Sequence, residues 1–233
     1  MKTFKIGGVH PAENKLSAAS PIREAALPKQ AVFSMFQHIG APAKPIVKKG
    51  DVVKVGTMIA EAGGFVSAPV HSSVSETVSK VDVVIDASGT RRQAIFVDVN
   101  GDEWEDAIDR SPELVRLSDR PELDAATIIN KVKEAGIVGL GGATFPCHVK
   151  LSPPPGSKAE CVIINAVECE PYLTADHRLM LEHPEEILVG VSLIMKAVSV
   201  EKGYIGIENN KTYIRHRCCV FPDVLCSFDK LPL

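Results

Sequence analysis

The chain has 233 residues, of which 45% are hydrophobic and 24% charged, and its net charge is −3. This composition is that of an ordinary folded protein with one large domain or two small ones, and it excludes a disordered chain. The balance of charge gives no reason to expect nucleic acid, and an aromatic share of 5% argues against a stacking platform for single strands.

Neither a membrane span nor a secretory signal is expected. The longest apolar run, residues 187–195, is far short of the ~20 residues that a transmembrane helix needs. The N-terminal residues carry charge but no apolar core of signal-peptide length. We therefore expect a cytoplasmic chain whose six cysteines are reduced thiols rather than a disulfide framework.

Residues 31–99 are rich in Val, Ile, Gly and Pro and contain short strand-like runs. The stretch 45–60 alternates strand and turn, with a tight reversal expected at 49–51, and the runs 65–70 and 74–81 repeat the pattern. Closely spaced short strands of this kind favour a small β-barrel or sandwich.

Helices and strands alternate in the second half of the chain. A charged, proline-containing stretch at 101–122 is expected to be a linker with a short helical turn. Residues 124–135 are predicted as a helix capped by Asp124 and closed by Gly136, and a longer helix is predicted to follow His183. Strands at 161–164 and 203–207 complete a pattern that is typical of a mostly parallel α/β layer.

Two segments are candidates for binding chemistry. Residues 136–146 form a glycine-dense loop, and glycine lets the backbone approach a phosphate because no Cβ blocks it. The acidic segment 165–172 follows the buried strand, at a position where open α/β sheets hold nucleotides. Together the segments predict a nucleotide or flavin pocket.

Several longer motifs, in the order 7–15, 37–44, 65–70, 139–146 and 165–176, carry a resemblance to a known family. From Phe4 to about Lys211 the chain closely resembles the N-terminal part of RnfC, the NADH-binding subunit of the Rnf ion-translocating electron-transport complex. The resemblance implies a small lipoyl-like barrel-sandwich hybrid domain of β structure. A partial α/β nucleotide-binding domain, like the complex I flavoprotein subunit, is implied to follow it.

The resemblance also implies a division of the chain and a function. Residues 1–100 would form the β-rich domain, 101–123 a linker, 124–211 the partial NADH/FMN-binding domain and 212–233 a divergent tail. The implied function is electron transfer from NADH through FMN in an NADH:ferredoxin oxidoreductase complex that is coupled to ion translocation. The implied partners are NADH and the other Rnf subunits, at the cytoplasmic face of the cell membrane.

The residues implied to bind FMN and NADH lie in both segments, shortly after the first one, and just beyond the strand at 203–207; they are Gly139, Gly141, Gly142, Ala143, Phe145, Lys150, Asn165, Glu168, Glu170, Tyr172 and Glu208. The glycines would face phosphates, and Phe145 would stack on NADH. Lys150 would pair with a phosphate or the flavin. Asn165, Glu168 and Glu170 would bond the flavin ring, its ribityl chain and the nicotinamide ribose.

Structural alternatives stand beside these roles. Phe145 is equally consistent with a core aromatic, Lys150 with a solvated lysine, and the acids with helix caps or surface-loop positions. Asp176 and Arg178 are expected to brace the loop through a salt bridge. The flavin would supply the chemistry, so no catalytic acid or nucleophile is expected, and the scattered histidines lack the spacing of a metal site.

The chain also departs from the family pattern. It lacks the repeated C-x-x-C-x-x-C motifs of an iron–sulfur domain, so we expect a truncation within the nucleotide domain, with an unpaired sheet edge after Ile207. The alternative is a non-catalytic fold remnant or docking protein.

A lipoyl or biotinyl carrier is disfavoured because the loop 62–66 has no lysine. Glu76 replaces a family glycine and would be strained at positive φ.

Overall fold

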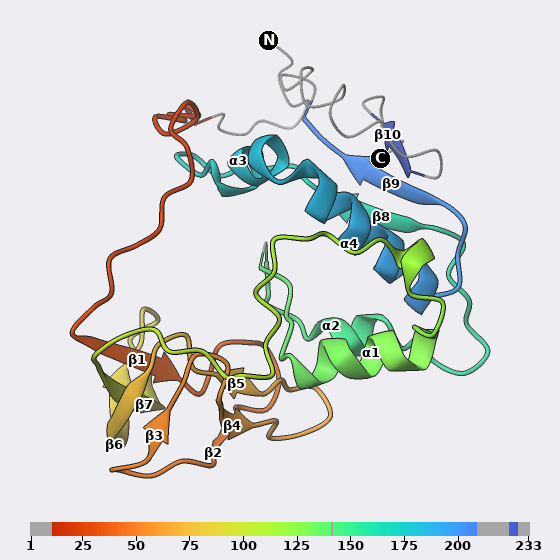
Figure 1. Cartoon of the computed structure of the whole chain (residues 1–233). Coiled ribbons are helices and arrows are strands. Elements are labelled where there is room, and N and C mark those ends of the chain that lie inside the picture. The colour runs from red at the N-terminus through yellow and green to blue at the C-terminus, as the bar shows by residue number, and fades with distance from the viewer. Residues whose placement is uncertain (1–10, 141, 209–223, 228–233) are drawn as a thin grey trace. The chain divides into compact units, whose positions relative to one another are not determined.

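A computed structural model describes residues 11–140 and 142–208, and residues 224–227 by their backbone alone. Its contacts form two compact units, whose elements are labelled in Figure 1. The barrel unit is Ala25–Lys158. The α/β unit combines residues 11–24, which we call the arm, with the described residues from Ala159 onward. The domain boundaries drawn from the sequence stay a prediction.

Two antiparallel sheets form the barrel unit, as the sequence predicted. The first has the strand order β1 (Gln30–Ser34), β7 (Arg91–Val99), β6 (Glu76–Ile85) and β3 (Val52–Val53). The second has the order β2 (Lys44–Pro45), β4 (Met58–Glu61) and β5 (Val70–His71). The tight reversal is confirmed at Gly50, whose φ is +92°.

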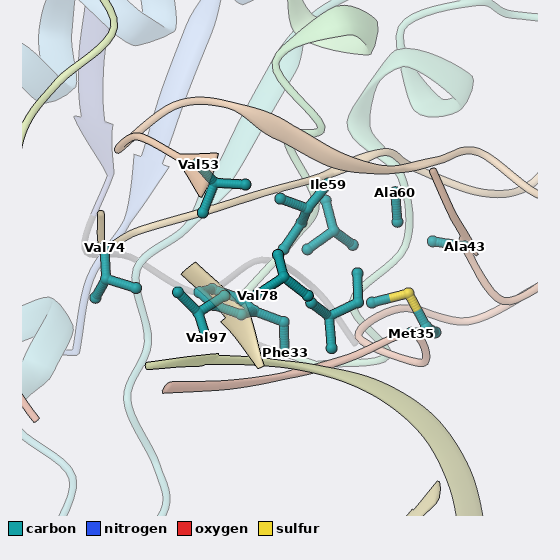
Figure 2. Packing of buried hydrophobic residues seen from close by; sticks show 11 residues of the cluster. Phe33, Met35, Ala43, Val53, Ile59, Ala60, Val74, Val78 and Val97 are labelled. Atoms are coloured by element: carbon teal, nitrogen blue, oxygen red, sulfur yellow. The ribbon is translucent and has the colours of Figure 1, made fainter. Parts of the chain in front are cut away.

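The core of the barrel unit consists of aliphatic side chains with one phenylalanine. Ile59, Val78 and Val97 are fully buried, and they come from β4, β6 and β7 respectively. Figure 2 shows these three side chains packed together with Phe33 and Met35. Residues of both sheets thus share one apolar interior, and its burial is the main favourable term in folding this unit.

Helix α1 (Ala125–Glu134) has the ends that the sequence predicted. The Asp124 carboxylate accepts a 2.7 Å hydrogen bond from the Thr127 N–H, and Gly136 ends the helix with φ +68°. A Cβ atom on Gly136 would lie 2.3 Å from the Pro69 carbonyl oxygen, so the helix end packs directly on the barrel backbone. The expected helical turn of the linker is the 3-10 helix η1 (Leu117–Asp119).

The α/β unit contains β8 (Val162–Asn165), α3 (Ala175–Glu182), α4 (Pro184–Ala197), β9 (Gly203–Gly206) and β10 (Val224–Ser227). Strand β9 pairs in parallel with both β8 and β10, which confirms the parallel layer. The expectation of an unpaired edge after Ile207 is wrong, because β10 covers that side of β9. The unit has its own apolar cluster, which includes Leu188 of α4 and Ile205 of β9.

Within the described ranges, no helix has both the length and the apolarity needed to cross a membrane.

Replacement of Glu76 by glycine is expected to raise the free energy of unfolding by about 1 kcal/mol. Glu76 has φ +124°, where an L-residue is strained by about 1–2 kcal/mol and glycine is not. Urea unfolding measures the change. Glu61→Gly is the control: Glu61 lies in β4 and is not among the described residues with positive φ, so this variant should lose stability. Equal losses in both variants would contradict the strain.

Replacement of Gly136 by alanine is expected to destabilise the chain more than Gly89→Ala does. Both glycines have similar positive φ values, +68° and +77°, so both variants carry a strain of about 1–2 kcal/mol. A Cβ on Gly89 would meet no atom within 4 Å, whereas one on Gly136 would clash with the Pro69 carbonyl. Denaturant unfolding of the two variants side by side measures the difference, and equal losses would show that the clash is relieved.

Candidate functional site

The glycine loop (residues 136–146) is a hairpin held closed at its base. Val138 bridges Pro146, the Gly139 N–H donates to the Phe145 carbonyl at 3.0 Å, and the Cys147 N–H donates to the Ile137 carbonyl at 2.9 Å. The Gly139 amide is therefore bonded within the loop itself. Gly141 lies outside the described residues.

The exposed tip of this hairpin contains Gly142 and Ala143. Within the described residues no hydrogen bond occupies the Gly142 N–H, and a Cβ there would meet no atom within 4 Å. Thr144, next to them, has φ +51°. The tip thus offers an open backbone face that a ligand can approach closely.

Lys150 places a cation beside the base of the loop. A Cβ on Gly139 would lie 2.8 Å from the Lys150 Nζ atom, so glycine at this position leaves the room that the ammonium group uses. The structure therefore brings Lys150 and Gly139 together. Phe145, between the tip and α2 (Cys147–Lys150), is half-buried. A cation beside an open glycine backbone is suited to an anionic group such as a phosphate.

The other two titratable side chains of α2 are held neutral. Burial lowers the pKa of His148, helped by the positive charge of Lys133. Burial also raises the pKa of the Cys147 thiol, although the nearby Lys150 opposes this shift. Both groups are therefore uncharged at neutral pH, and Lys150 supplies the charge of this helix.

The acidic segment leads from β8 into α3, and we call residues 166–174 the acidic loop. Because β8 and β9 are parallel, with Asn165 paired to Gly206, Asn165 and Glu208 lie at the same edge of the sheet. The Asn165 Oδ1 atom accepts a 3.1 Å hydrogen bond from the Val167 N–H and starts the turn of the loop. Glu208 is half-buried just beyond β9.

Glu168 caps a helix from a distance. Its side chain is only 3% exposed, and its Oε1 atom accepts a 2.9 Å hydrogen bond from the Asp176 N–H in the first turn of α3. Thr174, at the N-cap position, makes no capping hydrogen bond with its side chain. The capping alternative that the sequence left open thus describes one contact of Glu168, whereas Glu170 is exposed.

Tyr172 is bonded to the arm. It has φ +69°, its N–H donates to the Glu13 carbonyl at 2.9 Å, and its hydroxyl accepts a 3.3 Å hydrogen bond from the Asn14 amide. Its side chain is otherwise 59% exposed. Tyr172 thus joins two segments that are far apart in the sequence.

Sequence reasoning missed Lys15, which is part of the arm. The Lys15 Nζ atom donates to the carbonyl oxygens of Glu168, Glu170 and Leu173 at 2.6, 2.9 and 2.8 Å. Because Lys15 and its partners are more than 150 residues apart in the sequence, no local pattern predicts this contact. The available signal was the position of Lys15 at the end of the motif 7–15 that carries the family resemblance.

Arg178 of α3 makes two contacts. It forms an ion pair with Glu182, one turn along α3, and donates to the Ala18 carbonyl of the arm at 3.2 Å. Asp176 contributes its backbone N–H to Glu168. The arginine therefore ties α3 to the arm.

The candidate residues divide between the two units. The glycine loop and Lys150 belong to the barrel unit, whereas Asn165, the acidic loop and Glu208 belong to the α/β unit. The first set offers an open backbone and a cation. The second offers carboxylate and amide oxygens at the edge of a parallel sheet, where α/β proteins bind their ligands.

Comparison with known proteins finds two family models in succession. The RnfC barrel sandwich hybrid domain matches residues 2–102, and the Nuo51 FMN-binding domain matches residues 132–218. Among solved structures, an NAD+-reducing [NiFe]-hydrogenase in the air-oxidised state is similar, with 25% identity and a TM-score of 0.37 over 46% of this chain and 20% of that chain.

The chain is also similar to curated proteins. The C subunit of the Na+-translocating ferredoxin:NAD+ oxidoreductase complex of Acetobacterium woodii is 49% identical over 211 residues, which are 90% of this chain and 46% of that protein. The C subunit of the proton-translocating complex of Clostridium ljungdahlii is 45% identical over 91% of this chain and 45% of that protein. The chain thus spans under half the length of these relatives. The two matched domains and these identities show that it belongs to the RnfC family and corresponds to the N-terminal part of its members.

Proposed function

We propose that the chain is the FMN- and NADH-binding part of an electron-transfer subunit, which accepts hydride from NADH through FMN. The observation that carries the proposal is the match of the Nuo51 FMN-binding domain to residues 132–218, which include the glycine loop from Gly136 to Pro146 and all of the acidic loop. Both candidate segments therefore lie within one flavin-binding family pattern.

The glycine loop fits the phosphate of a nucleotide. Gly142 and Ala143 are exposed, and the Gly142 N–H, which is bonded to none of the described residues, is a donor that a phosphate oxygen can accept from. Lys150 adds a positive charge next to the base of the same loop. Gly141 is proposed to belong to this cradle with Gly139, whose lack of a Cβ makes room for Lys150.

The acidic loop fits the polar, uncharged parts of the cofactors. Asn165, Glu170 and Glu208 present amide and carboxylate oxygens that can accept hydrogen bonds from hydroxyl and ring N–H groups. Glu168 is proposed to take part through the loop that it shapes by capping α3. Phe145, which is half-buried, and Tyr172, which is exposed, are proposed to contact NADH.

When bound, FMN supplies the hydride chemistry. The protein residues then have to bind and orient the cofactors and to exclude water from them. Cys147 and His148 are neutral, so neither adds a charge at the end of the glycine loop.

The wider setting of this activity is also a proposal. The relatives are named as subunits of ferredoxin:NAD+ oxidoreductase complexes that translocate Na+ or protons. By this similarity we propose that the chain works in an Rnf-type complex with other Rnf subunits, peripherally at the cytoplasmic face of the cell membrane.

The purified chain is expected to bind FMN with a dissociation constant in the micromolar range. A titration that follows quenching of flavin fluorescence measures it. Saturable quenching, followed by bleaching of the flavin absorbance on addition of NADH, would support the electron-transfer proposal. A chain that is folded by circular dichroism but quenches no FMN would instead act as a non-catalytic docking protein.

Replacement of Gly142 by alanine is expected to weaken FMN binding about tenfold or more without loss of stability. The added Cβ meets no protein atom within 4 Å, so it hinders only a ligand that approaches the loop backbone. Gly190→Ala is the matched control, because a Cβ on this glycine of α4 also meets nothing within 4 Å. FMN titration and thermal unfolding of both variants test the prediction. Unchanged FMN affinity in Gly142→Ala would remove the glycine loop from the site.

A further inference from the structure

We propose that Lys15 is a positioning residue of the flavin site: it fixes the backbone of the acidic loop, although it lies more than 150 residues away in the sequence. The proposal rests on the function proposed above. It adds a residue that touches no cofactor in this scheme and acts through the loop that does.

The contacts of Lys15 use all the hydrogen-bonding capacity of its side chain. An ammonium group has three N–H donors, and those of Lys15 are directed to the carbonyls of Glu168, Glu170 and Leu173 at 2.6, 2.9 and 2.8 Å. Hydrogen bonds from a charged donor are stronger than those between neutral groups. One side chain therefore holds three carbonyls, spread over six residues of loop, at a single point.

The rest of the arm runs beside the acidic loop and α3. The Glu13 carbonyl accepts from the Tyr172 N–H at 2.9 Å, and the Ser17 and Thr174 hydroxyls are 2.7 Å apart. Further along, the Ile22 N–H donates to the Glu182 carboxylate at 3.1 and 3.2 Å. Figure 1 shows the arm in red near α3, within the same unit. Lys15 is thus one of several contacts that join the arm to the acidic loop and α3.

The choice of carbonyls as partners leaves the Glu170 carboxylate without an ion pair to Lys15. Within the described part of the chain, no ion pair joins the Lys15 ammonium to the Glu170 carboxylate. The Glu170 side chain is exposed, while its backbone is held. Lys15 can therefore order an acidic loop without neutralising the side chain that the site is proposed to use.

Hydrogen exchange on the full chain without flavin tests the first half of the proposal. In Lys15→Met, amides of residues 166–176 are expected to exchange at least tenfold faster, including the Tyr172 and Asp176 amides. Lys202→Met is the matched control, because Lys202 is an exposed lysine of the same unit. Unchanged exchange of the loop in Lys15→Met would overturn the proposal, whether or not the chain binds FMN.

FMN titration tests the second half. Lys15→Met is expected to bind FMN about ten- to a hundredfold more weakly, with Lys202→Met unchanged. Lys15→Arg keeps the charge, but its planar fork does not converge on three carbonyls as an ammonium does, so it should restore little affinity. Full recovery in Lys15→Arg would show an effect of charge alone and would contradict positioning.

A core variant separates positioning from global stability. Leu188→Ala removes a side chain that is 1% exposed in α4, and it lowers the stability of the unit without touching the arm. If it weakens FMN binding as much as Lys15→Met at equal fraction folded, the positioning role is wrong. If the wild-type chain binds no FMN, the proposed function fails, and the exchange experiment still decides the role of Lys15.

Discussion

In the α/β unit, one buried carboxylate has to be hydrogen-bonded, and this requirement constrains the chain around it. A carboxylate as enclosed as that of Glu168 is costly unless it is hydrogen-bonded, and the Asp176 N–H at the start of α3 meets part of that need. The location is favourable, because the N-terminus of a helix carries partial positive charge. Once this bond is made, the chain must turn tightly between β8 and α3. The turn places Tyr172 at positive φ and presents three carbonyls to Lys15.

The barrel unit holds its glycine loop by a different set of interactions. Backbone hydrogen bonds close this loop at its base. The loop ends at Pro146, which is buried, and begins at Gly136, which packs on the backbone of Pro69. Helix α2, which follows this loop, has a single charged side chain, Lys150, because Cys147 and His148 are held neutral. One unit thus offers backbone donors and a cation, and the other offers acceptor oxygens.

Local signals in the sequence predicted the elements whose causes are local. Asp124 caps α1, Pro184 opens α4, and Glu76 has the positive φ at which a side chain was expected to be strained. Helix α3 was not foreseen, because its cap comes from Glu168, eight residues before Asp176, rather than from its own N-cap residue. The same reason hid Lys15: its partners are brought to it by tertiary structure, and no spacing rule connects residues so far apart. Of the candidate site, the sequence could therefore predict the segments but not what holds them.

The separation between the arm and its partners also affects how the chain is made. Residues 13–22 leave the ribosome before the barrel unit, yet the groups that they bond lie between Glu168 and Glu182. At about 5–20 residues per second, those partners emerge roughly 8–30 seconds later. The strands of the barrel unit are all synthesised in that interval and can pair without the arm. The arm thus precedes the barrel unit in synthesis but can form these bonds only after the acidic loop and α3 have followed the barrel strands.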